Sequence, residues 1–165
     1  MMAYYICEFM VSIYPYSYTS SSIKEKIVEA GCISIGDYAF AFCNNLRTIQ
    51  LPSTISEIGK CAFQNCTSLK DLILPNNLEI INEKALSYCF SLELLSIPKN
   101  VRYIGDLAFV GCRNLTYVEF LSPSIEIGYN IFKSCASLEC VYIPRGSKNL
   151  YSKSLPHNAI KLIEQ

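Results

Sequence analysis

The sequence has little charge, a single histidine and no tryptophan. Charged residues make up 17% of the 165 residues and the formal net charge is zero, without a long run of Lys or Arg. Broad electrostatic attraction to nucleic acid or anionic lipid is therefore not expected. The motifs GxSxG, HExxH, GxxxxGK[ST] and GxGxxG are absent, and the lone His157 has no nucleophile nearby in the sequence. We therefore predict no enzyme, no catalytic residue and no cofactor.

The N-terminal stretch MMAYYICEFMVSIYPYSY is apolar and aromatic, but it does not resemble an export signal. It has no basic segment, contains Glu8 and Pro15, and offers no cleavage site of small residues. A membrane span needs about 20 largely uncharged apolar residues. We expect no membrane insertion and interpret residues 1–31 as an N-terminal degenerate repeat or cap, with a signal or anchor as the alternative.

What the sequence does have is a 23-residue repeat, without insertion or deletion. One unit reads ISEIGKCAFQNCTSLKDLILPNN. A fixed period of about 20–29 residues with a strand-like leucine pattern is typical of a leucine-rich repeat solenoid. The Ala-Phe-like pair and cysteine of each unit occur at Ala39-Phe40…Cys43, Ala62-Phe63…Cys66, Ala85-Leu86…Cys89, Ala108-Phe109…Cys112 and Ile131-Phe132…Cys135.

Each unit predicts a short strand followed by two turns. The LxxIxLP pattern, as in residues 46–52, alternates like a strand with one face inward, and its proline ends the pairing. The Ala-Phe-x-x-Cys segment is expected to form a short helical or 3₁₀ turn on the convex side, with its Phe in the core. A tight turn with positive φ is expected at the column Gly36, Gly59, Asn82, Gly105 and Gly128. The predicted fold is a solenoid with a parallel β-sheet on its concave face.

Nine cysteines require an explanation, because five of them share the repeat column given above. Neighbouring repeats stack at about 4.8 Å, which is within disulfide reach. However, each column cysteine has two equivalent neighbours, and five cannot all pair. We favour a buried column of free thiols over structural disulfides. No CxxC pair is present, so no metal site is expected.

These motifs resemble the BspA-like (Treponema pallidum-type) leucine-rich repeat family, found in bacterial and protozoan surface antigens. The resemblance covers about residues 20–147 and rests on LxxIxLP, the Ile-Gly pair, the Ala-Phe pair and the repeat cysteine. It implies five repeats over residues 32–147. The tail 148–165 resembles the family's C-terminal cap, with Tyr151 in it and with Ile160 and Ile163 on the last repeat. His157 stands where an aromatic residue is more usual.

The candidate partner site consists of outward-facing strand residues on the concave face. Large exposed apolar and aromatic side chains on such a surface are typical of partner sites, and Tyr is a frequent hot-spot residue. The alternative is that edge loops cover these side chains or that they are neutral. The predicted site residues are Gln50, Asp71, Ile73, Leu94, Ser96, Tyr117, Glu119 and Tyr142.

Two functions follow for a repeat protein without catalytic motifs. The resemblance implies a cell-surface or extracellular antigen, an adhesin that binds host or other cell-surface proteins through its concave face. The unpaired cysteines and the missing signal instead favour an intracellular scaffold or adaptor in the cytoplasm. If the chain is a fragment of a longer repeat protein, we expect it to self-associate through the exposed ends of the solenoid.

Overall fold

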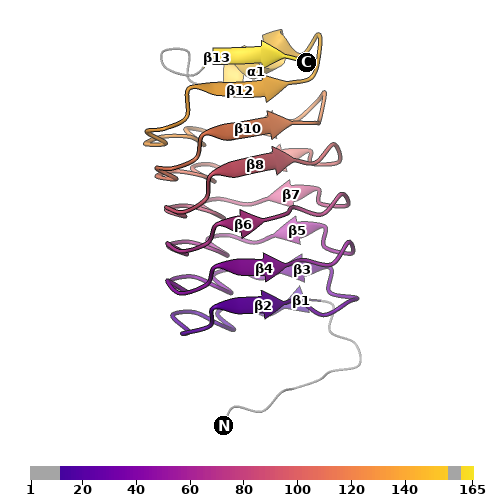
Figure 1. Ribbon diagram of the computed structural model, residues 1–165. Coiled ribbons are helices and arrows are strands. Elements are labelled where there is room, and N and C mark those ends of the chain that lie inside the picture. Colours follow the sequence, from indigo (N-terminus) through magenta and orange to yellow (C-terminus); the bar gives the residue numbers. More distant parts are fainter. Residues whose placement is uncertain (1–11, 156–160) are drawn as a thin grey trace.

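The computed structural model is a stack of parallel rungs that runs the length of the molecule (Figure 1). The structure describes residues 12–155 and 161–165. Cys7, His157 and Ile160 lie outside these residues, and so do the expectations that concern them. The stack confirms the predicted leucine-rich repeat solenoid, because the strands of successive rungs pair at the 23-residue step of the sequence, as Tyr117 does with Leu94.

The front of the stack carries the strands that the LxxIxLP motif predicts. They pair in parallel, but they form two sheets, one of three strands and one of four, and no pairing joins β6 to β8. The first sheet contains β2 (Glu25–Ile27), β4 (Thr48–Gln50) and β6 (Asp71–Leu72). The second contains β8 (Leu94–Ile97), β10 (Tyr117–Phe120), β12 (Cys140–Ile143) and β13 (Lys161–Glu164).

A second parallel sheet of six short strands lies behind the front strands (Figure 1). It is continuous along the described stack. From β3 on, each strand ends one residue before the column of glycines and Asn82, and its last isoleucine faces the core. The strands are β1 (Ser12–Ile13), β3 (Ser34–Ile35), β5 (Glu57–Ile58), β7 (Ile80–Ile81), β9 (Tyr103–Ile104) and β11 (Glu126–Ile127).

The Ala-Phe-x-x-Cys segments form the expected short turns, such as that from the Cys43 amide to the Phe40 carbonyl at 3.1 Å, but they do not continue into a helix or 3₁₀ helix. Within the described ranges the one helix is α1 (Lys148–Ser154), which follows the last repeat. The physical reason is that these segments bond between rungs: the Phe40 amide donates to the Ala62 carbonyl at 2.8 Å, and Phe63 donates to Ala85 at 2.8 Å. Left-handed residues also recur at two columns of the segment, such as Lys84 (φ 54°) and Tyr88 (φ 58°), and they interrupt helical geometry.

The glycine column is explained by close approach and not by the positive φ that we expected. Gly36, Gly59, Gly105 and Gly128 do not have positive φ. A Cβ built on Gly105 would lie 2.5 Å from the backbone nitrogen of Glu83 in the neighbouring rung. The glycines therefore let the backbones of neighbouring rungs meet.

The core lies between the two layers and contains stacked aromatic rings. Tyr18, Phe40 and Phe63 stack with ring centroids 4.9 and 5.2 Å apart, and Phe109 stacks on Phe132 at 5.5 Å. Phe40, Phe63 and Phe109 have no exposed surface. This confirms that the Phe of each repeat is inserted between the layers. Such pairs contribute about 0.5–1.5 kcal/mol beyond the area that they bury.

The five column cysteines are buried and free. Each thiol donates to a backbone carbonyl of the preceding rung; for example, Cys66 Sγ lies 3.1 Å from the Phe40 oxygen and Cys89 Sγ lies 3.3 Å from the Phe63 oxygen. Burial raises the pKa of the Cys89 thiol to about 12, so it stays protonated and able to donate. The column therefore joins the rungs by hydrogen bonds.

The C-terminal segment closes the stack with a helix and a strand. Tyr151 of α1 is fully buried; its hydroxyl donates to the Ser122 carbonyl at 2.6 Å and its ring lies 4.9 Å from that of Phe120. Strand β13 pairs in parallel with β12. Its Leu162 packs against the core, whereas Ile163 lies in register with Tyr142 on the front face. Ile163 therefore lies beside the last repeat, as expected, but on its front face, because the strand's two-residue alternation points Leu162 inward.

Candidate functional site

The outward side chains of the seven front strands form one surface, which we call the front face. It corresponds to the predicted concave face. In one column Leu94 lies beside Tyr117, and Tyr117 beside Cys140; in the next, Ser96 lies beside Glu119, and Glu119 beside Tyr142. All eight predicted residues are described and at least partly exposed: Gln50, Asp71, Ile73, Leu94, Ser96, Tyr117, Glu119 and Tyr142.

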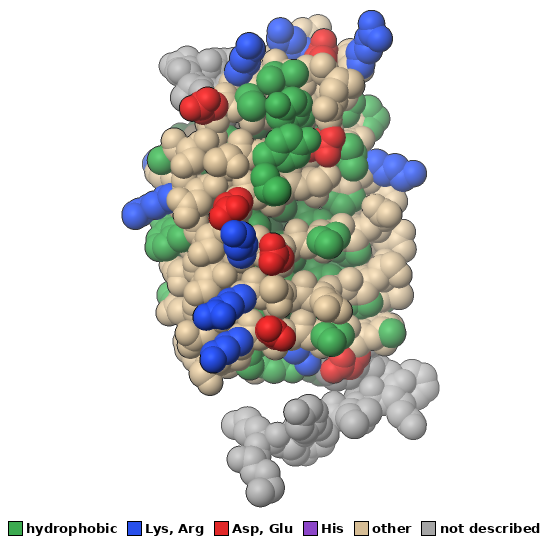
Figure 2. Space-filling view, viewed as in Figure 1, with side chains coloured by type: hydrophobic (Ala, Val, Ile, Leu, Met, Phe, Trp, Pro, Cys, Tyr) green, Lys and Arg blue, Asp and Glu red, His purple; other side chains and the backbone are tan. Residues whose placement is uncertain are grey.

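Two tyrosines form an aromatic pair on the C-terminal half of this face. The rings of Tyr117 and Tyr142 have centroids 4.9 Å apart and are tilted by 31°. Leu94, with 61% of its surface exposed, is in register with Tyr117. Figure 2 shows hydrophobic side chains gathered over the upper front strands, with charged side chains below and at the rim. Burial raises the pKa of the Tyr117 phenol, so this hydroxyl stays neutral and available as a hydrogen-bond donor.

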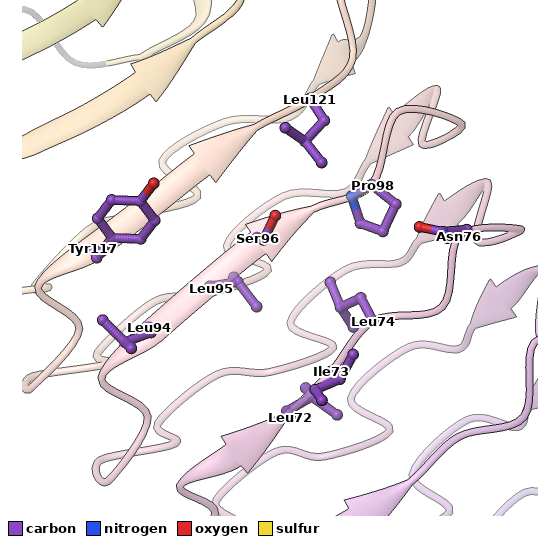
Figure 3. Close-up of a pocket in the computed structure, with 10 residues that line it drawn as sticks. All are labelled: Leu72, Ile73, Leu74, Asn76, Leu94, Leu95, Ser96, Pro98, Tyr117 and Leu121. Carbon is purple, nitrogen blue, oxygen red and sulfur yellow. The ribbon is translucent and has the colours of Figure 1, made fainter. Parts of the chain in front are cut away.

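A groove lies where the front sheet is interrupted between β6 and β8. Its volume is about 390 Å³. Figure 3 shows Leu72, Ile73 and Leu74 on one side of the groove and Leu94 and Leu95 of β8 on the other. Four predicted residues line it, namely Ile73, Leu94, Ser96 and Tyr117. Six further lining residues were not predicted: Leu72, Leu74, Asn76, Leu95, Pro98 and Leu121.

The remaining predicted residues lie around this groove at different distances. Asp71 directly precedes the lining residue Leu72 on β6. Glu119 accepts a hydrogen bond from Ser96 Oγ at 3.3 Å and another from the side chain of Gln165. Tyr142 joins through its ring contact with Tyr117. Gln50 lies on β4 and does not line the groove.

Sequence reasoning missed the groove because its cause is a missing strand pairing. Leu72, Leu74 and Leu95 occupy inward columns, and in an unbroken sheet they would belong to the core alone. Ile163 was not predicted as a front-face residue for another reason. Which side of β13 it occupies follows only once residues 161–164 are known to form a strand. Cys140 is half-buried in the Tyr117 column, in register with Tyr117, and the repeat pattern does place it there.

The described residues were compared with the patterns of a metal site and of a membrane span. They contain no group of three or more His, Cys, Asp or Glu side chains placed to hold a metal ion. Nor does any helix among them have the length and apolar character needed to cross a membrane. The ionisable groups of the front face are mainly carboxylates and phenols, with the Cys140 thiol and the exposed Lys161 at its C-terminal end. This face can therefore make apolar contacts, stack on a partner and accept hydrogen bonds.

The family model described as BspA type leucine rich repeat region matches residues 11–139 in six copies. The sixth copy agrees with the additional rung that β1 and β2 form below the five repeats found in the sequence. The comparison with curated proteins returns no match.

Solved structures of bacterial repeat proteins are similar to the chain. A leucine-rich repeat protein from Bacteroides ovatus is 31% identical with a TM-score of 0.75, and the match covers 81% of this chain and 37% of that one. A leucine rich cell surface protein from Faecalibacterium prausnitzii is 26% identical with a TM-score of 0.75, and the match covers 90% of this chain and 38% of that one. The leucine rich repeat protein of T. pallidum is 24% identical with a TM-score of 0.71, and the match covers 87% of this chain and 76% of that one. At this identity the likeness shows the fold alone. The chain thus spans less than half the length of the first two.

Proposed function

Since the chain belongs to the BspA-type leucine-rich repeat family, whose members are generally protein-interaction or surface repeat proteins, we propose that it is a non-catalytic protein-binding module. Specifically, it acts in an adhesin-like surface antigen that binds host or other cell-surface proteins through its front face. The repeats of residues 32–147 carry the binding surface, and residues 148–165 cap it. No nucleic acid, cofactor or metal takes part.

The observation that carries this proposal is the Tyr117–Tyr142 pair beside an exposed Leu94. Repeat proteins use extended surfaces of this kind for binding. Aromatic residues with a polar end are enriched at the centres of protein interfaces, where they bury a large area and keep one hydrogen bond. Here the rings lie on rigid paired strands, so a partner would order few side chains on binding.

The surface location draws support from the name of one similar structure, a leucine rich cell surface protein from Faecalibacterium prausnitzii. Because the chain matches only 38% of that protein, the role of the longer protein is carried over as a proposal. Self-association through the rung ends remains a prediction, which sedimentation of the isolated chain at increasing concentration would test.

A second candidate is an intracellular scaffold with the same binding face. The observation that favours it is the set of free cysteines within the described residues. To separate the candidates, the protein is purified without reductant and denatured, and its free thiols are then titrated. Nine titratable thiols would support the scaffold in a reducing compartment, and a deficit would support export.

The test of the binding face is a pull-down from cell-surface and cytosolic extracts. The wild type is compared with Tyr117→Ala/Tyr142→Ala and with the matched control Tyr103→Ala/Tyr129→Ala, whose tyrosines lie on or just after back strands β9 and β11. We expect a surface or matrix protein that is retained by the wild type and the control but lost with the front pair. Equal retention by all three proteins would refute the front-face assignment, and capture of cytosolic proteins alone would favour the scaffold.

A further inference from the structure

We propose that the groove between β6 and β8 receives an extended protein segment that places an aliphatic side chain in the groove and a Lys or Arg beside it. This inference rests on the proposed function and narrows its partner to one chemistry. It is carried by three independent features of the described residues: the interrupted sheet, the aliphatic lining and two carboxylates that make no ion pair there.

The interruption is confined to the front of the stack. Behind it, β5, β7 and β9 pair without a break, while β6 ends one front sheet and β8 begins the other. The rungs are therefore held together at the back and open at the front. Strand edges that lack a neighbour in the sheet are where extended segments pair through their backbone. An extended segment fits this place better than a helix does.

The lining selects an aliphatic side chain. Ile73, Leu94 and Leu121 expose 84%, 61% and 45% of their surface around the groove, and buried Leu72 and Leu95 lie beneath them. Figure 3 shows these side chains on the two facing strands and on the edge beyond them. A groove of about 390 Å³ falls in the size range of small binding sites. Covering these leucines and the isoleucine removes apolar surface from water, which favours binding.

The charges at the rim select a basic neighbour. Asp71 and Glu119 make no ion pair with any described residue, whereas Lys70 and Glu93 neutralise each other at 3.1 Å. Lys99, which follows Pro98 at the far end, is exposed and also makes no ion pair there. Asp71 and Glu119 thus place two carboxylates without an ion pair beside Leu94 and Tyr117, whereas Lys161 lies further along this column, beyond Cys140. A Lys or Arg of the partner would meet Asp71 or Glu119, and its stem would lie on the Tyr117 ring.

In the experiment, a displayed library of short random peptides is selected for binding to the folded chain. The Kd of each enriched peptide is then measured. Two variants test the two features: Ile73→Ser/Leu94→Ser removes the aliphatic rim, and Asp71→Asn/Glu119→Gln removes the charges. The control is again Tyr103→Ala/Tyr129→Ala. Because Ile73 and Leu94 are exposed, the first variant should stay folded, which its circular dichroism spectrum and melting curve would verify.

We expect enriched peptides that combine an aliphatic residue with Lys or Arg. Their Kd should rise about tenfold or more with Ile73→Ser/Leu94→Ser. With Asp71→Asn/Glu119→Gln, binding should weaken and lose most of its dependence on salt. Enrichment of acidic peptides, equal binding to the first variant, or no enrichment at all would overturn the inference. If a captured protein is lost with Tyr117→Ala/Tyr142→Ala but kept by Ile73→Ser/Leu94→Ser, the groove assignment fails while the proposed function stands.

Discussion

Replacing Gly105 by alanine tests whether close approach explains the glycine column. The new Cβ would lie 2.5 Å from the Glu83 nitrogen and 2.8 Å from the Asn82 carbonyl carbon, where ordinary contact begins at 3.4 Å. The rung must therefore move by about 0.9 Å (3.4 − 2.5). That shift would stretch the 2.8 Å bond from the Gly105 amide to the Ile81 carbonyl to about 3.7 Å, too long for a hydrogen bond. Overpacking costs about 1–3 kcal/mol and the lost bond about 1, so we expect about 2–4 kcal/mol.

The assay is urea unfolding followed by far-UV circular dichroism, with Gly146→Ala as the control. Gly146 has φ +80° and open space around it, so alanine there adds backbone strain alone, about 1–2 kcal/mol. Asn82 shows how a side chain is accommodated in the column, since its amide donates to Glu57 Oε1 at 2.7 Å and to the Ile58 carbonyl at 3.3 Å. Alanine cannot make these bonds. If Gly105→Ala lies within about 0.5 kcal/mol of the wild type, a value typical of neutral surface changes, the reasoning is refuted.

Three further predictions concern the core and its thiols. Tyr151→Phe removes the buried donor to the Ser122 carbonyl and should lower the free energy of unfolding by about 1–3 kcal/mol, measured by urea unfolding; an unchanged midpoint would contradict this. Burial raises the pKa of Cys89 from 9.0 to about 12, so unfolding releases protons above pH 9 and stability should fall from there towards pH 12; a melting temperature that stays constant over this range would count against it. Iodoacetamide should modify half-buried Cys140 before the column cysteines, and mass spectrometry of native protein showing Cys89 modified first would oppose this.

Much of the fold could be predicted from the sequence, because the same pattern of apolar and turn residues recurs in each repeat. The columns of Phe40 and Cys43 recur at one spacing, and burial of both follows from their chemistry. The turn geometry was harder to predict, since a glycine is compatible with both positive φ and close approach. Only the neighbouring rung, which places Glu83 against Gly105, separates the two explanations. The same holds for the back sheet, whose two-residue strands carry no alternation long enough to recognise.

The candidate site likewise has one part that could be predicted from the sequence and one that could not. Tyr117 and Tyr142 could be placed on one face from strand alternation, because parallel register repeats it from rung to rung. The groove could not be predicted, since it arises where β6 and β8 fail to pair although their repeats match the motif. The repeat motif describes the residues of a single rung. It does not predict whether the strands of two neighbouring rungs pair.

Binding and stability should therefore be separable in this chain. Stability comes from the buried columns and from hydrogen bonds between rungs, such as that of Cys66 to the Phe40 carbonyl. The front strands pair through their backbones, but most outward side chains of the front columns lie outside the buried core: Ile73 and Leu94 are largely exposed, and Tyr117 contacts Tyr142 on the surface. Front-face variants that abolish binding should unfold at nearly the wild-type urea concentration, within the roughly 0.5 kcal/mol typical of surface changes. A large loss of stability in Tyr117→Ala/Tyr142→Ala would mean that the pair holds the upper rungs together, and its binding defect would then say nothing about a partner.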